Sequence, residues 1–534
     1  MRRILLLLAL PTSLAAQQPD LRAVADSVFR DRNASDAPGC AVGVARGGTV
    51  LLTRAYGMAD LESGRANTVA TIFESGSVAK QFTAAATVLL AVDGKLNLDD
   101  PVQKYLPELP TYDRPLTIRH LLTHTSGLRE WSSLVAAQGW PRGTRRHTQT
   151  DLFDVVTRQQ ALNYPVGDYY SYTNSGFGLL FTIVERVSGM SFQEFSQERL
   201  FRPLGMAHTR WRDDFTAIVP ERAQAYAPER DGWHLDMPFE DVVGPGGLLT
   251  TVGDLLRWNE ALTNRTLGTA VVDSMSHQMR LTSGREIQYG LGLFFMSYRG
   301  ISEVSHSGST AGYRTYLARY PDHGNLSVAV LCNAANANAG AYAHALVDAL
   351  VTDFPPPPML DTTAVDSATF ARVLGVYHST RTHGLLVVTQ EMRGRLRALP
   401  DGSYWSNRGS ARWLFDVGPD GVPTGIRILQ SDGDTVVMLF ASRELWKPTT
   451  EQLAQLAGRY HSEELQVTYE VAVGGDTLTL RIRPGSTFAL SPAFGDGFEA
   501  PFGAVWFTRD RRGRVAAMHV GEGRMWNLVL PRMP

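Results

Sequence analysis

Four consecutive prolines, Pro355 to Pro358, divide this 534-residue chain into two unlike parts. Proline cannot continue a helix or a central strand, and a run of prolines favours an extended spacer. The residues before the run mix helical and strand patterns, whereas those after it form short strand-like runs between Gly and Asp turns. We therefore expect a mixed part at 20–353, a linker at 354–359 and an all-β part behind it.

The all-β part contains a weak internal repeat. The sequence LGVYHS at 374–379 recurs as AGRYHS at 457–462, and a short helical segment precedes each copy. Such a duplication predicts two successive small antiparallel β-barrels, one over 360–446 and one over 447–534.

The mixed part begins and ends with strand patterns and is largely helical between them. Strands at both ends with helices between them predict one sheet covered by a large helical region, which is an α+β architecture. The expected strands are 41–44, 50–52, 313–320 and 326–331, and the expected helices are 81–92, 118–122 and 177–187.

The N-terminus indicates where the protein is located, and the charge balance restricts its partners. The first 16 residues join Arg2 and Arg3 to a short apolar run and small residues, which is typical of a cleavable signal peptide and predicts a periplasmic or secreted location. No later stretch is apolar over about 18 residues, so we expect no membrane span in the mature chain. The 51 Lys and Arg nearly balance the 53 Asp and Glu, which gives no reason to expect a nucleic-acid partner.

The chain has two cysteines, Cys40 and Cys332. Two are too few for a disulfide scaffold or a cysteine-built metal site. Both stand at the ends of expected strands, a position that favours buried free thiols, while export leaves a disulfide open.

Ser77 and Lys80 stand three residues apart where the apolar helix expected at 81–92 begins. On a helix they would share one face. A serine hydroxyl needs a neighbouring base to become a nucleophile, and a lysine serves as one when burial lowers its pKa. The apolar residues that follow would bury Lys80, and the backbone N–H groups of a helix start favour an oxyanion. In isolation, an N-cap serine followed by an exposed lysine fits the same spacing.

A second polar segment holds Tyr172 and Asn174, two apart, before the apolar helix expected at 177–187. A tyrosine hydroxyl can relay protons to a leaving group, and an asparagine can hold a substrate amide. An aromatic loop that packs on the core is the alternative.

A third polar segment, with His306, Gly308 and Ser309, precedes the strand expected at 313–320. Gly308 would let a substrate backbone approach the strand edge. The backbone N–H of Ser309 would then complete an oxyanion hole with that of Ser77. The alternative is a polar turn at the start of a strand.

Together the three segments resemble the motifs of the serine β-lactamase and penicillin-binding superfamily, in particular its class C β-lactamase-related branch. They occur in the family's order, at 77–80, 172–174 and 306–308, and the resemblance covers residues 22–350. It implies a β-lactamase/transpeptidase-like fold in which Ser77 is acylated and Lys80 and Tyr172 share the acid–base work. It also implies that Asn174 binds the substrate amide and that the strand with His306 and Gly308 flanks the acyl group.

One position departs from the family pattern. The third motif of penicillin-recognising enzymes usually begins with a Lys that meets the antibiotic's carboxylate, whereas here it begins with His306. A neutral histidine is a weaker anchor for a carboxylate. The departure argues against β-lactam hydrolysis and favours peptide or ester substrates.

The downstream part narrows the expected activity. A catalytic domain followed by two lipocalin-like barrels resembles the D-aminopeptidase arrangement, in which a barrel loop reaches the active-site mouth and helps select a free amino terminus. The resemblance implies hydrolysis of D-amino-acid peptides or amides. A carboxylesterase, a β-lactamase and a catalytically silent ligand-binding module stay open as alternatives.

No metal or other cofactor is expected. His120 and His124 are four apart, but no Glu stands in the H-E-x-x-H position and no third ligand is evident. The resemblance implies a structural helix for this segment. The expected partner is a small-molecule or peptide substrate, and the sequence leaves a homodimer open.

Overall fold

The computed structural model describes residues 20–534 except 357–358, 407–410, 431–432 and 484. The predicted signal peptide and two of the four linker prolines lie outside the described residues. Within them, no helix is both long enough and apolar enough to cross a membrane.

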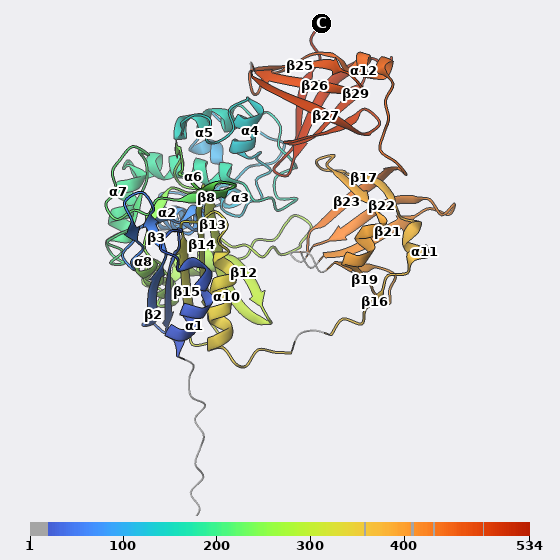
Figure 1. Ribbon diagram of the computed structural model, residues 1–534. Coiled ribbons are helices and arrows are strands. Elements are labelled where there is room, and N and C mark those ends of the chain that lie inside the picture. The colour runs from blue at the N-terminus through green and yellow to red at the C-terminus, as the bar shows by residue number, and fades with distance from the viewer. Residues whose placement is uncertain (1–19, 357–358, 407–410, 431–432, 484) are drawn as a thin grey trace, which may run out of the picture.

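A six-stranded antiparallel sheet, the central sheet, brings the two ends of the N-terminal part together. The first strand in the sequence, β1 (Cys40–Arg46), lies between β2 (Thr49–Tyr56) and β15 (Leu326–Cys332), the last strand of this part. Blue and yellow-green strands are therefore neighbours in Figure 1. Val42 and Val44 face α1 (Leu21–Val28) and α10 (Ala339–Leu350), because side chains alternate along a strand. In sheet order the strands are β12 (Phe294–Tyr298), β13 (Ile301–Thr310), β14 (Tyr313–Tyr320), β15, β1 and β2.

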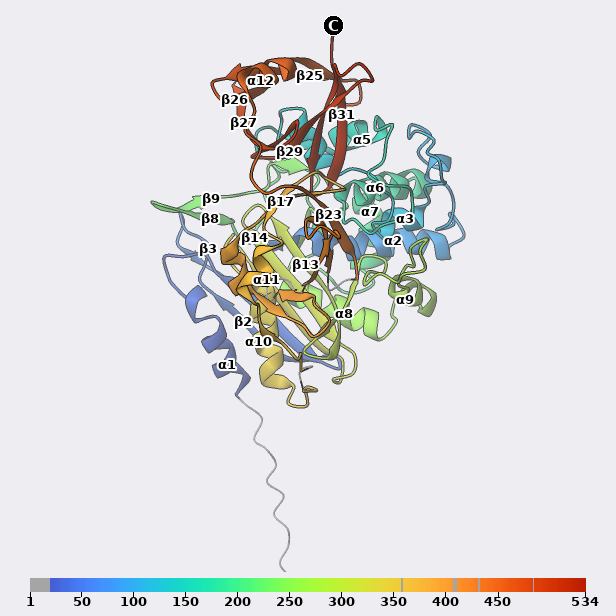
Figure 2. The same ribbon diagram turned by 90° about the vertical axis from the view of Figure 1, so that its right-hand side faces the viewer.

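The opposite face of the sheet and the helical region share one core. Its central element is α2 (Lys80–Val92), which is buried from Lys80 to Leu90 because nearly every side chain on it is apolar or small. Figure 2 shows α2 among the other helices beside the sheet. These are α3 (Ile118–Leu122), α4 (Trp131–Ala137), α5 (Gln149–Thr157), α6 (Asn174–Ser188), α7 (Phe192–Ser196), α8 (Val252–Thr263) and α9 (Thr269–Ser276).

Short elements connect these layers. The strands are β3 (Met58–Asp60) with β4 (Arg65–Ala66), β5 (Phe73–Glu74) with β11 (Leu248–Thr250) and β7 (Arg210–Trp211), β6 (His147–Thr148) with β10 (Glu240–Asp241), and β8 (Tyr226–Glu229) with β9 (Gly232–Leu235). The short helical segments are η1 (Arg30–Arg32), η2 (Gly76–Ala79), η3 (Val102–Lys104) and η4 (Gln197–Phe201), and a further one, η5 (Gln390–Arg395), lies in the downstream part.

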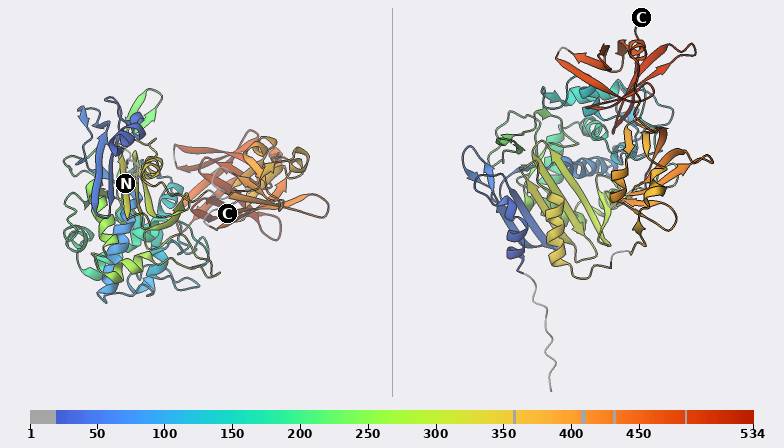
Figure 3. Two further views of the ribbon diagram at one scale, coloured as in Figure 1. Left: turned by 90° about the horizontal axis from the view of Figure 1, so that it is seen from below. Right: turned by 45° about the vertical axis from the view of Figure 1, so that its right-hand side comes forward.

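The downstream part forms two eight-stranded antiparallel sheets, which lie together on one side of the N-terminal part (Figure 3). In the first C-terminal sheet, which stays open, every strand except β16 (Thr363–Ala364) follows α11 (Ser367–Ala371). In sheet order this sheet consists of β16, β19 (Leu396–Ala398), β20 (Tyr404–Ser406), β21 (Ala411–Val417), β22 (Pro423–Leu429), β23 (Thr435–Ser442), β17 (Gly375–Ser379) and β18 (Leu385–Val388).

The second C-terminal sheet follows α12 (Thr450–Leu456) and nearly closes into a barrel. Its first and last strands approach each other through a bridge between Tyr460 and Arg532, and the Met533 backbone N–H donates to the Arg459 carbonyl oxygen at 2.8 Å. The strands are β24 (Gly458–Ser462), β25 (Val467–Gly474), β26 (Thr477–Arg483), β27 (Ser486–Phe494), β28 (Gly497–Ala500), β29 (Gly503–Arg509), β30 (Val515–Glu522) and β31 (Met525–Pro531). The predicted fold class is therefore confirmed, with a half-open first barrel.

A disulfide joins Cys40 of β1 to Cys332 of β15. The sequence left a disulfide open but favoured two free thiols, and this preference was wrong because the strand register places the two cysteines directly opposite each other. The two residues face each other directly in the β1–β15 register, with their Cα atoms 4.0 Å apart.

Candidate active site

Ser77 lies in the 3₁₀ turn η2, directly before α2, and not inside the helix that the sequence predicts. The turn packs on β13, where a Cβ on Gly308 would collide with the carbonyl oxygen of Ser75. Glycine at 308 therefore allows the Ser77 turn to pack directly on the strand. From the sequence alone, this glycine was explained by the approach of a substrate. His306, Gly308 and Ser309 lie within β13 itself, not in a turn before a strand.

Lys80, the first residue of α2, is completely buried. Its Nζ donates to the Ser77 Oγ at 3.1 Å and to two carbonyl oxygens at 2.7 Å, the Asn174 Oδ1 and the Pro245 backbone oxygen. Burial holds the pKa of Lys80 well below its usual value, and the Glu130 carboxylate opposes this shift in part.

These contacts determine the direction in which the lone pair of a neutral Lys80 points. A neutral amine has two N–H bonds and one lone pair. When the oxygens of Asn174 and Pro245 take both N–H bonds, the lone pair is directed at the Ser77 hydroxyl. The arrangement can therefore remove the serine proton without any movement of the lysine.

Tyr172 lies over Lys80, with the ammonium 4.9 Å from the centre of its ring. Burial raises the pKa of Tyr172, so its hydroxyl keeps its proton, although neighbouring Ser77 lowers the value in part. The buried hydroxyl oxygen has no partner in hydrogen-bonding geometry among the described residues. A protonated hydroxyl without a partner is suited to donate to a group that only a substrate brings.

Asn174 begins α6, and its side chain is already engaged on both sides. The Oδ1 accepts from Lys80, and the Nδ2 donates to the Glu130 Oε1 at 3.1 Å. The Glu130 Oε2 in turn accepts from the Asn174 backbone N–H at 2.5 Å and from the Thr173 hydroxyl at 3.0 Å. Glu130, which the sequence analysis did not identify, thus fixes the asparagine that orients Lys80.

His306 is almost completely buried and neutral. Its Nδ1 donates to the Ser307 carbonyl oxygen at 2.7 Å, and its Nε2 accepts from the Tyr289 hydroxyl at 3.1 Å. Burial and the neighbouring Lys80 charge lower the pKa of His306 to about 3. The third motif therefore supplies no cation at physiological pH.

His124, which the sequence analysis assigned to a structural helix, lies beside Tyr172 instead. It lies two residues after the last residue of α3, with a left-handed backbone (φ of 57°), so the expected structural helix does not contain it. Its buried ring lies 4.2 Å from the Tyr172 ring, between centres, and its Nδ1 accepts from the Thr173 N–H at 3.2 Å. Burial lowers its pKa well below the usual value, so a neutral ring supports Tyr172.

A pocket of about 40 Å³ opens beside Ser77. Ser309 and Gly76 line it next to the serine, and Asn174 lines it on the side of Lys80. Arg142 and Glu240 also line the pocket, and the Arg142 Nε donates to the Glu240 Oε2 at 2.7 Å. Arg142 also lines a larger, mostly apolar cavity of about 520 Å³ between α4 and the second C-terminal sheet.

Comparisons with known proteins identify the family of the N-terminal part. Residues 25–353 match the family described as Beta-lactamase. The chain is 31% identical to penicillin-binding protein 4* of Bacillus subtilis over 52% of its own length and 64% of that protein. It is 26% identical to a D-aminopeptidase of Brucella anthropi, over 91% of this chain and 93% of that one.

Solved structures share the fold. An octameric penicillin-binding protein homologue from Pyrococcus abyssi superposes with a TM-score of 0.55, at 22% identity, over 87% of this chain and 98% of that one. A D-amino acid amidase from Ochrobactrum anthropi SV3 gives 0.53, at 22% identity, over 62% and 98%. Since the family match covers more than half of the sequence, this chain belongs to the beta-lactamase family and is a serine hydrolase of the penicillin-binding and β-lactamase superfamily.

Proposed function

We propose that this protein is an exported peptidase or amidase that cleaves small D-amino-acid peptides and amides through an acyl-enzyme on Ser77. The observation that carries the proposal is the set of contacts around Lys80. Two carbonyl oxygens hold its N–H bonds, so a neutral Lys80 can act as the base for Ser77.

In the first step, Lys80 takes the Ser77 proton while the Oγ bonds to the substrate carbonyl carbon. Charge then develops on the carbonyl oxygen, where the backbone N–H groups of Ser77 and Ser309, both of which line the pocket, would stabilise it. Glu130 contributes indirectly, because it holds Asn174 in the orientation that Lys80 requires.

In the second step, the C–N bond breaks and the Tyr172 hydroxyl gives its proton to the leaving nitrogen. The raised pKa of Tyr172 keeps that proton in place until the nitrogen is ready to accept it. Lys80 then returns the serine proton to the tyrosine oxygen, and water hydrolyses the acyl-enzyme by the reverse sequence of proton transfers.

The D-peptide specificity is supported by the extent of similarity. The Brucella anthropi D-aminopeptidase aligns over both C-terminal sheets as well as the N-terminal part. The neutral His306 supports the proposal that amides, and not β-lactams, are the substrates, because it supplies no cation for an antibiotic carboxylate.

Three further features belong to the proposal. The predicted signal peptide at 1–16 gives a periplasmic or secreted protein, and the Cys40–Cys332 disulfide is suited to that oxidising environment. The working units are a catalytic domain at 20–353, a linker at 354–359 and barrel domains at 360–446 and 447–534. A homodimer stays open, and light scattering on the mature protein would measure the oligomeric state.

The test is mass spectrometry of the mature protein with a fluorophosphonate, alongside turnover of D-Ala p-nitroanilide, p-nitrophenyl butyrate and nitrocefin. We expect a covalent label on Ser77 and turnover of the D-Ala amide, and Ser77→Ala should lower that turnover by at least about 10³-fold. Preferred turnover of the butyrate or of nitrocefin would indicate an esterase or a β-lactamase. No label and no turnover would favour a binding module.

A further inference from the structure

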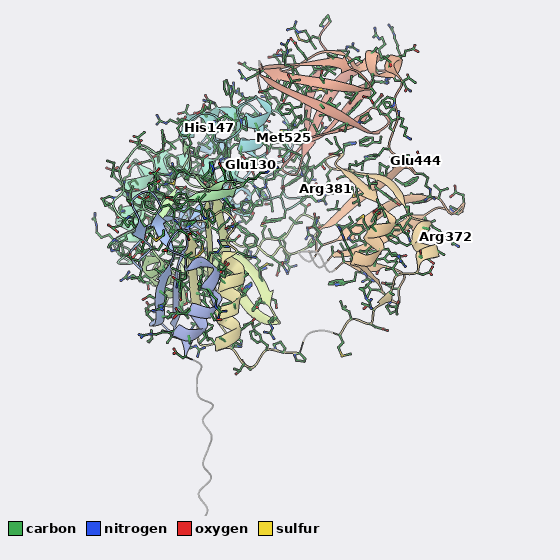
Figure 4. The ribbon with its side chains drawn as sticks, viewed as in Figure 1. Glu130, His147, Arg372, Arg381, Glu444 and Met525 are labelled. Carbon is green, nitrogen blue, oxygen red and sulfur yellow. A yellow bond between two sulfur atoms is a disulfide. The ribbon has the colours of Figure 1, made fainter. Side chains whose placement is uncertain are left out.

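The turn between β30 and β31 of the second C-terminal sheet reaches the candidate active site. The Arg524 carbonyl oxygen accepts from the Glu130 backbone N–H at 3.2 Å and from the Asn163 Nδ2 at 2.9 Å. The Trp526 N–H donates to the Asn163 Oδ1 at 2.9 Å. Figure 4 shows Met525, at the end of this turn, beside Glu130 of the N-terminal part.

Aromatic and cation–π contacts to the N-terminal part and to the first C-terminal sheet hold this turn in place. The Trp526 ring packs on those of Tyr164 and Tyr169, with centres 4.9 and 5.8 Å away. The guanidinium of Arg381, from the first C-terminal sheet, lies 5.2 Å from the centre of the Trp526 ring. The position of Arg524 is therefore set by the backbone and by Trp526, not by its own side chain.

The Arg524 side chain is exposed, and its guanidinium carbon lies 5.2 Å from the centre of the Tyr172 ring. Among the described residues this guanidinium forms no ion pair and no hydrogen bond. The nearest acidic residue along the turn, Glu522, accepts from the Arg524 backbone N–H at 3.3 Å. An exposed cation therefore lies over the residue that would protonate the leaving group.

The other charges near Ser77 are engaged or neutral. Glu130 accepts four hydrogen bonds, from Asn174, Thr173 and Ser132. Arg142 pairs with Glu240, and His306 is neutral. An incoming anion would thus find its partner at Arg524, on the side of Tyr172 and not at the third motif.

We propose that Arg524 binds the carboxylate of the leaving group, so that the preferred substrates are short D-peptides with a free carboxyl terminus one residue beyond the scissile bond. In an amino-acid leaving group the carboxylate carbon lies about 2.5 Å from the nitrogen that Tyr172 protonates. The anion must therefore lie close to the Tyr172 hydroxyl, and the exposed guanidinium of Arg524 lies over the ring that carries this hydroxyl. This inference rests on the proposed function and deepens it.

The test compares D-Ala-D-Ala with its C-terminal amide, with the released D-alanine or D-alaninamide quantified by mass spectrometry. The wild type should prefer the free acid. In Arg524→Gln the ratio of kcat/KM for the acid to that for the amide should fall by about 10- to 100-fold, mainly through KM, because one charge-assisted hydrogen bond is lost. Arg524→Lys should recover part of the ratio.

Arg511→Gln is the matched control, because Arg511 is an exposed arginine in the turn between β29 and β30 of the same sheet. It should keep the wild-type ratio, and thermal unfolding should show all variants folded. An unchanged ratio in Arg524→Gln, with the peptides still cleaved, overturns the inference and leaves the proposed function intact. If the wild type cleaves neither peptide, the proposed function fails and the inference fails with it.

Discussion

The two C-terminal sheets share a design at their start but differ in what they do for the site. In both, a tyrosine of the strand that follows the short helix donates to a carbonyl oxygen at or just beyond the end of that helix, Tyr377 to Val373 at 2.7 Å and Tyr460 to Leu456 at 2.6 Å. The first sheet keeps a small core of its own, whereas the core of the second merges with that of the helical region. The repeated helix and strand thus give both barrels the same start. Whether a barrel contributes to the active site depends on the rest of its surface, which differs between the two.

The largest expected effect concerns catalysis, which we assign to the N-terminal part and not to the C-terminal sheets. If the N-terminal part performs the chemistry, kcat/KM for D-Ala p-nitroanilide should rise with pH as Lys80 loses its proton and then level off well below its usual pKa of 10.5. The neutral form is the base, so activity is lost as pH falls. His306, with a pKa of about 3, should add no step between about pH 5 and about pH 9.

Lys80→Met is the control for this pH profile, and it should remove at least about 10³-fold of the activity. A profile that falls near neutral pH would contradict the assignment, because it would require another group to act as the base. The measurement is kcat/KM across the pH range at constant ionic strength.

Contacts between the sheets and the N-terminal part should show an intermediate effect. Glu464 of the second sheet accepts from Arg129, which is nearly completely buried, at 2.7 Å and from the Gln160 backbone N–H at 2.9 Å. Glu464→Gln should lower the free energy of unfolding by about 1–3 kcal/mol, because it leaves a buried cation without its counter-charge. It should also lower kcat/KM severalfold, since Glu130 follows Arg129 directly.

The matched variant in the first sheet is Asp416→Asn, which breaks an exposed ion pair with Arg427 within that sheet. It should leave the denaturation midpoint and kcat/KM close to those of the wild type, because solvent screens an exposed ion pair. Equal losses of activity in the two variants, measured with denaturant unfolding in parallel, would remove the distinction between the sheets.

The smallest effects should come from the repeated tyrosines. Tyr377→Phe and Tyr460→Phe each delete one buried hydrogen bond, worth about 1 kcal/mol. In calorimetry, Tyr377→Phe should lower only the transition of the first sheet, and Tyr460→Phe only the one that the second sheet shares with the N-terminal part. A single transition that both variants shift equally would show that the sheets unfold as one unit.

The sequence predicted what depends on local pattern. The apolar run after Lys80, the helix at 118–122 and the strand at 313–320 all match the structure, because periodicity and residue type determine them. The spacing of Ser77 and Lys80 pointed to a contact that the structure shows at 3.1 Å.

What the sequence could not predict depends on distant contacts. Glu130 and Arg524 carry no motif, and the role of His124 could not be derived from its neighbours. Each of the three gains its place from a partner far along the chain, Glu130 from Asn174, His124 from Tyr172 and Arg524 from Asn163. The disulfide followed from the sheet order and the position of Gly308 from close backbone packing, and neither is encoded by neighbouring residues.

The turn at 522–526 has a consequence for the order in which the enzyme becomes complete. β31 ends at Pro531, so the turn that carries Arg524 is fixed only after the residues up to Pro531 have been synthesised and folded. The nucleophile and its base, at 77 and 80, are made hundreds of residues earlier. A nascent or C-terminally clipped chain would therefore acquire its reactive serine before it acquires its substrate selectivity.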